Sequence, residues 1–316
     1  MQVLIFSILT ILISASSARA QSQTQLPLVD LPDGKDGTTV RYGYELLANT
    51  PEYLGSKGKI KKLTSSRLAC RNCHLDVGAR PSGNSWLDAH GLYPQYRARE
   101  GRVQTLADRT NACFKHNLQS KPLPVDGPEM NAILRYYRWL GRGRPALLKD
   151  PDNRLPPLEL LSRAADVAAG EKIFGAKCMR CHGSNGEGQL RADGVAYLYP
   201  PLWGKESFVD GSSMSRLSMM ARFVKANMPF GVTADKPELS NEEAWDVSAF
   251  VLSHGRPKWN GKKVFSSLGD KPFDYPFGPY ADEFPLEQHK IGPFLPVIDH
   301  WRKLQGPRAS EPTTSI

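Results

Sequence analysis

Two short stretches decide how this chain folds, CRNCH at residues 70–74 and CMRCH at residues 178–182. Both have the form C-x-x-C-H, the attachment signature of c-type haem. Two thiols at this spacing each form a thioether with one haem vinyl group, and the adjacent His becomes an iron ligand. We therefore expect two covalently bound haem c groups. The predicted haem-binding residues are Cys70, Cys73, Cys178 and Cys181, with His74 and His182 on the iron.

Two other uses of paired cysteines fit the pattern less well. Structural zinc sites usually combine pairs that lie closer together, whereas here the two pairs are far apart and each ends in His. A thioredoxin-like redox motif requires a βαβ context, and none is visible around either motif.

The composition is that of a globular protein rich in loops. The chain has 316 residues, of which 40% are hydrophobic and 23% charged. Its 25 prolines predict much loop and little sheet. The formal net charge of +9 favours anionic small molecules or proteins as partners. We expect neither a nucleic-acid partner nor a membrane span.

The N-terminus resembles an export signal. An apolar run at residues 3–13 is followed by small residues and by Ala-Arg-Ala at residues 18–20. The run is too short to span a bilayer, which requires about 20 apolar residues. The pattern predicts cleavage after Ala20 and a soluble, periplasmic mature protein. A buried N-terminal helix is the alternative, because no Lys or Arg precedes the run.

The chain is an internal repeat. Each haem motif is followed by an amphipathic helical pattern and then by Gly-Arg-Pro. The second closing helix starts with a capping box at residues 240–243, and residues 166–177 form the helix that enters the second motif. Gly170 would allow a close helix crossing there. This layout resembles class I cytochromes c, which implies an all-α fold.

The expected organisation is two haem domains in tandem, with long loops and an extended C-terminal arm rich in Pro and aromatic residues. The expected segments are a signal peptide at 1–20, an N-terminal extension at 21–40, a first domain at 41–145, a Pro-rich linker at 146–160, a second domain at 161–258 and the arm at 259–316.

The second domain offers Met228 as the distal iron ligand. A Met ligand is typical of electron-carrying haems and raises their potential. Met228 lies in a loop with Pro229 and Gly231 that can hold the thioether toward the iron. Three other methionines are candidates for the same role, Met214, Met219 and Met220. They lie in a helical stretch, where Met more often packs in the core.

The first domain has no Met at the matching place. Its single Met, Met130, lies in the closing helix and is better explained as core. Cys113 occupies the matching place and is the one Cys left after the haems have taken four. We expect Cys113 to be the distal ligand. His90, His116, a buried free thiol or an intermolecular disulfide remain as alternatives.

Basic residues precede Cys113. Arg97, Arg99, Arg102 and Arg109 lie close together in sequence. They could be solvated helix residues. Beside a thiolate, which is a good nucleophile near basic groups, they would suit a small dianion, because guanidinium donates in a planar fork.

Together these features resemble dihaem thiosulfate dehydrogenases. The more specific part is YPQYRAR at residues 93–99, followed by Arg109-x-Asn111-x-Cys113. The resemblance implies that two thiosulfates are joined into tetrathionate at the first haem, reversibly in some members. Electrons would leave through the second haem to a cytochrome or another redox protein. It also implies that His74 and Cys113 are axial ligands, that Arg99 and Arg109 bind substrate, and that Asn111 orders the loop.

Two positions depart from the family pattern. Asn117 stands where the family often has Ser, and Asn227 where it often has Lys, so substrate binding and ligand switching at the second haem could differ. Lys225 lies nearby but points elsewhere on a helix. The alternative functions are a dihaem electron carrier and a thiosulfate-to-cysteine transferase subunit of a sulfur-oxidising complex. A dihaem peroxidase fits less well, because its catalytic haem needs an open distal side.

Overall fold

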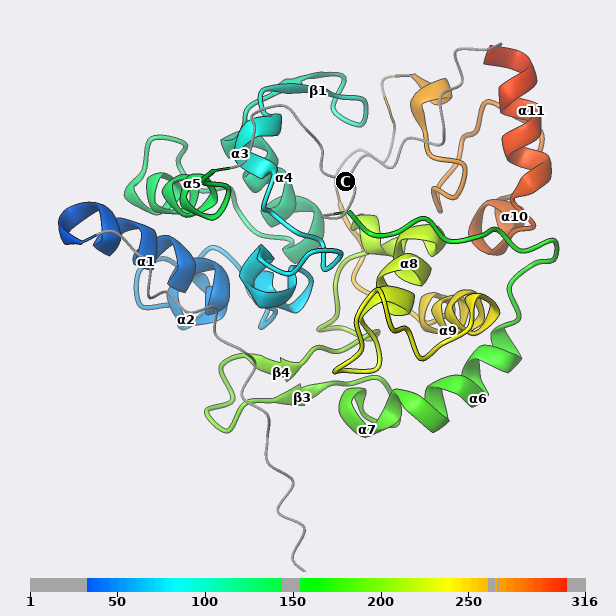
Figure 1. Cartoon of the computed structure of the whole chain (residues 1–316), viewed down its shortest axis with the longest axis horizontal. Coiled ribbons are helices and arrows are strands. Elements are labelled where there is room, and N and C mark those ends of the chain that lie inside the picture. Colours follow the sequence, from blue (N-terminus) through cyan, green and yellow to red (C-terminus); the bar gives the residue numbers. More distant parts are fainter. Residues whose placement is uncertain (1–32, 144–153, 261–264, 266, 306–316) are drawn as a thin grey trace, which may run out of the picture.

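The computed structural model describes residues 33–143, 154–260, 265 and 267–305. These residues form two mainly helical domains followed by a tail that folds back on the second domain (Figure 1). The predicted signal peptide, the first part of the predicted linker and the last residues of the arm lie outside the described ranges. Within the described part, every helix is too short or too polar to cross a lipid bilayer.

The sheets are small, as the proline content predicts. In the first domain β1 (Gln95–Arg97) pairs with β2 (Arg102–Gln104), and in the second β3 (Gln189–Leu190) pairs with β4 (Tyr197–Tyr199), both antiparallel. All other regular elements are helical. Those of the first domain are α1 (Gly34–Ala48), α2 (Thr50–Leu54), η2 (Cys70–Asn72), η3 (Leu75–Gly78), α3 (Ala89–Leu92), α4 (Leu106–Leu118) and α5 (Pro128–Leu140). Those of the second are α6 (Val167–Lys177), α7 (Met179–His182), η5 (Ser213–Ser215), α8 (Leu217–Asn227) and α9 (Asn241–Ser253).

In the first domain α1 crosses α5 at Gly43. A Cβ there would lie 2.1 Å from the Ala132 carbonyl oxygen, so only Gly lets the helices approach this closely. Met130 is fully buried in α5, as expected for a core residue. The helix α1 begins at Gly34, inside the segment expected to be an extension, because its buried Val40 belongs to this core.

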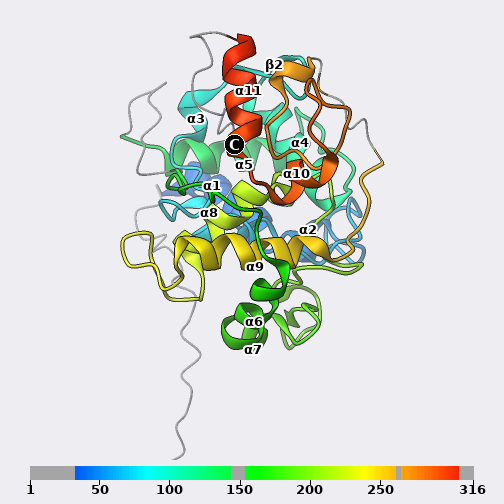
Figure 2. The same cartoon turned by 90° about the vertical axis from the view of Figure 1, so that its right-hand side faces the viewer.

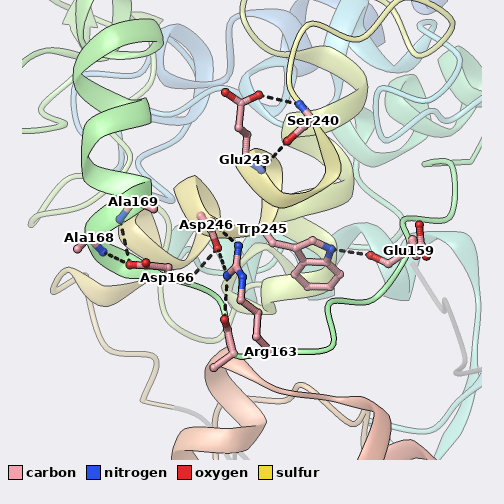
Figure 3. A network of polar contacts seen from close by, with 10 residues as sticks. Glu159, Arg163, Asp166, Ala168, Ala169, Ser240, Glu243, Trp245 and Asp246 are labelled. Carbon is pink, nitrogen blue, oxygen red and sulfur yellow. Dashed lines mark hydrogen bonds and ion pairs between the residues drawn. The ribbon is translucent and has the colours of Figure 1, made fainter.

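The second domain repeats this crossing with α6 and α9. A Cβ on Gly170 would lie 2.0 Å from the Asp246 carbonyl oxygen, which confirms the predicted close approach. The predicted capping box is also present, with Ser240 Oγ accepting from Glu243 N at 3.0 Å and Glu243 Oε2 from Ser240 N at 2.8 Å. Asp246 accepts two bonds from the Arg163 guanidinium, each 2.9 Å long (Figure 3).

The arm expected to be extended is partly helical. After η6 (Leu268–Asp270), it forms α10 (Leu286–Ile291) and α11 (Leu295–Gln305). Apolar side chains at helical spacing in α11, including the buried Val297 and Ile298, pack in one cluster with Trp245 of α9. In both views the tail lies at the end of the second domain opposite α7 (Figures 1 and 2).

Polar contacts join the two domains. Arg67 Nε donates to Glu206 at 2.8 Å, and the Tyr197 hydroxyl bonds the same carboxylate at 2.6 Å. Asn227 Nδ2 donates to the Ser82 carbonyl at 2.8 Å. The bond between Asn227 and Ser82 is buried, and it helps to fix the domains relative to each other because breaking it would leave unsatisfied polar groups.

Candidate haem sites and a cationic cavity

Both C-x-x-C-H motifs adopt the same backbone turn. The His74 amide donates to the Cys70 carbonyl, and the His182 amide donates to the Cys178 carbonyl, both at 3.0 Å. In the first motif Thr50 also holds the turn, since its hydroxyl oxygen accepts from the Cys70 amide at 3.2 Å. The two repeats of the motif therefore share the hydrogen bond that closes the turn between the first cysteine and the histidine.

Each motif histidine is oriented by a backbone carbonyl. His74 Nδ1 lies 2.6 Å from the Asn84 carbonyl oxygen, and His182 Nδ1 lies 2.8 Å from that of Pro200. A carbonyl only accepts, so Nδ1 carries the proton and Nε2 keeps a free lone pair for a metal.

Burial keeps both imidazoles neutral. It lowers the pKa of His74 to about 4 and also lowers the pKa of His182. His74 is further fixed by stacking on Trp86, with ring centroids 4.3 Å apart. Neutral imidazole is the form that binds metal, so both side chains are ready to act as iron ligands.

A large, mostly apolar cavity adjoins the motif of the second domain, and residues of the first domain form part of its wall. Its space, including the part open to solvent, is about 1710 Å³, and it is lined by Cys178, Cys181, His182 and Met228. Apolar side chains such as Phe223 form much of the remaining wall. Two cysteines, an imidazole and a thioether around one apolar space fit a haem c with His and Met as axial ligands.

The rival methionines are placed differently. Met219 is buried in the core and does not line the cavity, whereas Met214 and Met220 line it as tightly packed core side chains that are 6% and 4% exposed. Met228 follows the end of α8 directly and is only half-buried. Its thioether therefore has the freedom to turn toward a bound iron.

A second cavity in the first domain brings His74 and Cys113 together. Its space, including the part open to solvent, is about 840 Å³. The charged residues of its wall are three arginines and one carboxylate, namely Arg97, Arg109, Arg154 and Asp88, and Tyr93 also lines it. Cys113 lies in the middle of α4, whose start is capped by Thr105 through a bond from the Asp108 amide at 3.1 Å. The expected proximal and distal residues thus share one space, as ligation of one haem requires.

The cavity wall is strongly cationic. Negative charge on Cys113 raises the pKa of the Arg109 guanidinium, because the two groups lie close together. Burial and the like charge of Arg109 lower the pKa of Arg97. Among the described residues, no carboxylate lies within ion-pair distance of either guanidinium. Two half-buried guanidiniums without a carboxylate partner form a site for an anion.

Of the two arginines that the resemblance assigns to the substrate, Arg99 lies elsewhere. The resemblance placed it in the substrate site, but it does not line the cavity of His74 and Cys113. Its Nη1 donates to the Gly211 carbonyl at 2.8 Å, and its guanidinium lies 4.6 Å from the Trp259 ring centroid. The end of β1 explains the difference, because the strand stops at Arg97, which lines the cavity, and Arg99 lies in the turn that follows.

The other residues considered for the first site lie outside its cavity. Asn111 is buried, and its amide exchanges two hydrogen bonds with the Leu123 backbone, at 2.8 and 2.9 Å. This bond pair ties α4 to the loop that follows it. His90 and His116 do not line the cavity. Burial lowers the pKa of His116 to about 3, and its ring packs against Trp259 instead.

The two positions that depart from the family pattern lie between the domains. The Asn117 carbonyl accepts from the Val209 amide at 3.4 Å. Asn227 is buried, lines the second cavity and donates to Ser82, as described above. Lys225 bonds the Leu239 carbonyl instead of reaching that cavity.

Comparison with known proteins agrees with this geometry. Residues 167–255 match the family model Cytochrome c, and residues 48–146 match SoxA/TsdA, cytochrome c domain. Thiosulfate dehydrogenase of Allochromatium vinosum is 40% identical over 231 residues, which are 72% of this chain and 82% of the relative. The enzyme of Stutzerimonas stutzeri is 33% identical over 229 residues, 72% of this chain and 71% of the relative.

The chain belongs to the thiosulfate dehydrogenase family. A solved structure, thiosulfate dehydrogenase (TsdBA) from Marichromatium purpuratum, superposes on 76% of the chain with a TM-score of 0.67 and 30% identity. This chain covers half of the length of that one. The family fold confirms the expected all-α architecture of two cytochrome c domains.

Cytochrome c domains carry covalently bound haem c, and the residues of this chain fit that group. The free Nε2 atoms, the paired cysteines and the apolar second cavity supply what it needs. In residues 33–143, 154–260, 265 and 267–305, no group of three His, Cys, Asp or Glu side chains is arranged to hold a metal ion.

Proposed function

We propose that this protein is a periplasmic dihaem cytochrome c that oxidises two thiosulfates to tetrathionate. The observation that carries the proposal is the first cavity, where His74 and Cys113 face the same space as two guanidiniums without a carboxylate partner. A thiol, an imidazole and two guanidiniums around one space suit a small anion that can be oxidised and that reacts with a cysteine sulfur. The relatives named thiosulfate dehydrogenase support the same substrate.

Two haems would be held by the two motifs. Cys70, Cys73 and His74 would hold the first, with Cys113 as its second axial residue, and the second would lie between His182 and Met228. Each haem, when bound, accepts one electron, so the pair matches the two electrons released per tetrathionate.

Charge is the main obstacle to bringing the substrates together. Two thiosulfates are both dianions, and each pair of unit charges 4 Å apart costs about 4 kcal/mol at an effective dielectric near 20. Arg97 and Arg109 line the cavity and offset this repulsion. Arg109 and Cys113 line the same cavity wall, so the substrate anion would be held beside the sulfur that attacks it.

The reaction balances with Cys113 as the carrier of sulfur. Joining the Cys113 thiolate to the sulfane sulfur of one thiosulfate forms an S–S bond and releases two electrons. The sulfane sulfur of a second thiosulfate then attacks the bound sulfane sulfur. The new S–S bond completes tetrathionate, and the Cys113 thiolate leaves.

The acceptor and the compartment complete the proposal. Electrons would leave from the second domain to another cytochrome or redox protein. The N-terminal apolar run and Ala-Arg-Ala sequence support export to the periplasm.

Steady-state turnover with thiosulfate and ferricyanide tests the function. We expect one tetrathionate for every two thiosulfates consumed and every two ferricyanides reduced. A protein with redox-active haems that consumes no thiosulfate would instead be an electron carrier. Thiosulfate consumption that requires a protein cysteine as sulfur acceptor, without tetrathionate, would show a transferase.

A further inference from the structure

Arg71 belongs to the first haem motif but lines the cavity of the second domain. It lies between the two cysteines of the first motif, and its neighbours Asn72 and Cys73 line the same space. The wall opposite includes His182 and Met228. The attachment loop of one domain therefore forms part of the binding cavity of the other.

The guanidinium of Arg71 makes no ion pair within the described part of the chain. Its Nε atom is buried without a hydrogen-bond partner, and no carboxylate lies within ion-pair distance. Burial and the nearby Arg191 lower its pKa, and the more distant Glu52 and Glu45 offset this only in part. Arg80 lines the same cavity but is already paired, with Nε 2.9 Å from the Asp76 carboxylate.

A guanidinium with a buried, unpaired Nε that faces a cavity is a donor for an anion. The second cavity is the one that the residues fit for haem c, and the anionic groups of haem are its propionates. We infer that Arg71 of the first domain binds a propionate of the haem held by the second domain. The inference rests on the proposed presence of two haems and adds a role that neither domain could supply alone.

Arg71 then sets the potential of the second haem. A fixed positive charge beside the haem stabilises the reduced form, because reduction removes positive charge from the iron. Hydrogen bonding and local charge are among the means by which a protein tunes haem potential. Arg71 would therefore help to draw electrons from the first domain into the second. It is a positioning residue and makes no contact with substrate.

Redox titration of the full haem-loaded protein without thiosulfate tests the inference. We compare Arg71→Gln with Arg80→Gln, which removes an already paired charge from the same cavity. In Arg71→Gln we expect the reduction equilibrium of the His/Met haem to fall about tenfold, equivalent to about 59 mV for one electron. Arg80→Gln should shift it by much less, and Arg71→Lys should retain part of the effect.

An unchanged potential of the second haem in Arg71→Gln would overturn the inference, and so would a shift confined to the first haem. An equal shift in Arg80→Gln would also overturn it, because total charge and not Arg71 would then be responsible. If Arg71→Gln fails to retain haem, Arg71→Lys provides the test. An ammonium group cannot reproduce the paired hydrogen bonds of a planar guanidinium, so we expect a partial fall in the potential of the second haem. A potential of the second haem equal to that of the wild type in Arg71→Lys would contradict a paired contact with a propionate. None of these readings depends on thiosulfate turnover, so they remain valid if the proposed activity fails.

Discussion

His74 and Cys113 line one cavity although they lie on separate elements of the first domain. His74 follows the turn that begins at Cys70, while Cys113 lies in the middle of α4. Their relative position depends on how α4 is anchored, at its start by Thr105 and along its length by the bonds between Asn111 and the Leu123 backbone. The distance between the two expected axial residues is thus set by hydrogen bonds outside the cavity.

The mature protein should carry two covalent haems, because both motifs adopt the same turn with a neutral, oriented histidine. Mass spectrometry of the exported protein should give the chain from Gln21 plus two haem masses. A mass with one haem would contradict the dihaem assignment.

Loss of either cavity guanidinium should weaken substrate use. A hydrogen bond to a charged group contributes about 1.5–3 kcal/mol, so Arg97→Gln and Arg109→Gln should each lower kcat/KM by about tenfold to a hundredfold. Arg102→Gln is the matched control, since its guanidinium lies outside the cavity and pairs with Asp108 at 3.1 Å. Equal losses in all three variants would indicate a general charge effect and not a built site.

Removing the thioether from the second cavity should impair electron exit. In Met228→Gly we expect a lower potential of the second haem, because a Met ligand raises it, while thiosulfate still reduces the first domain. Stopped-flow spectra and spectroelectrochemical titration measure the two effects separately. If the potential of the second haem stays at its wild-type value, Met214 or Met220 is the ligand, since both line the same cavity.

Replacing each of two glycines on α6 by Ala should change the stability of the protein in opposite directions. Gly170→Ala places a methyl group 2.0 Å from the Asp246 carbonyl oxygen and should destabilise the protein by about 1–3 kcal/mol. Gly175→Ala meets no atom within 4 Å and should stabilise it by up to about 1 kcal/mol, through better helix propensity. Denaturant unfolding of the haem-loaded variants measures both. Similar effects at the two positions would argue against the close crossing of α6 and α9.

Much of the fold could be predicted from local sequence signals. The capping box at Ser240 and the small residue at Gly170 correctly predicted a helix start and a helix crossing. Each of these features acts through near neighbours or through a single steric requirement. The equivalent crossing at Gly43 also requires a residue without a side chain. Gly43 lies far ahead of the first haem motif, so its distance from the motif did not predict the crossing.

The remainder depended on tertiary placement. The Asn84 and Pro200 carbonyls orient the histidines through backbone atoms, which no residue pattern encodes. The choice between Arg97 and Arg99 for the cavity depends on the end of a three-residue strand. The helix α11 was missed because the Pro and aromatic content of the arm concealed its apolar periodicity.

Turnover of Cys113→Gly tests the account most directly, because Cys113 is proposed as both axial residue and sulfur carrier. Tetrathionate formation from thiosulfate should fall to background, while the redox spectrum and potential of the second haem remain those of the wild type. No other thiol can replace Cys113, since the remaining four cysteines belong to the two haem motifs. A variant that keeps both haems and most of its thiosulfate oxidation would contradict the account.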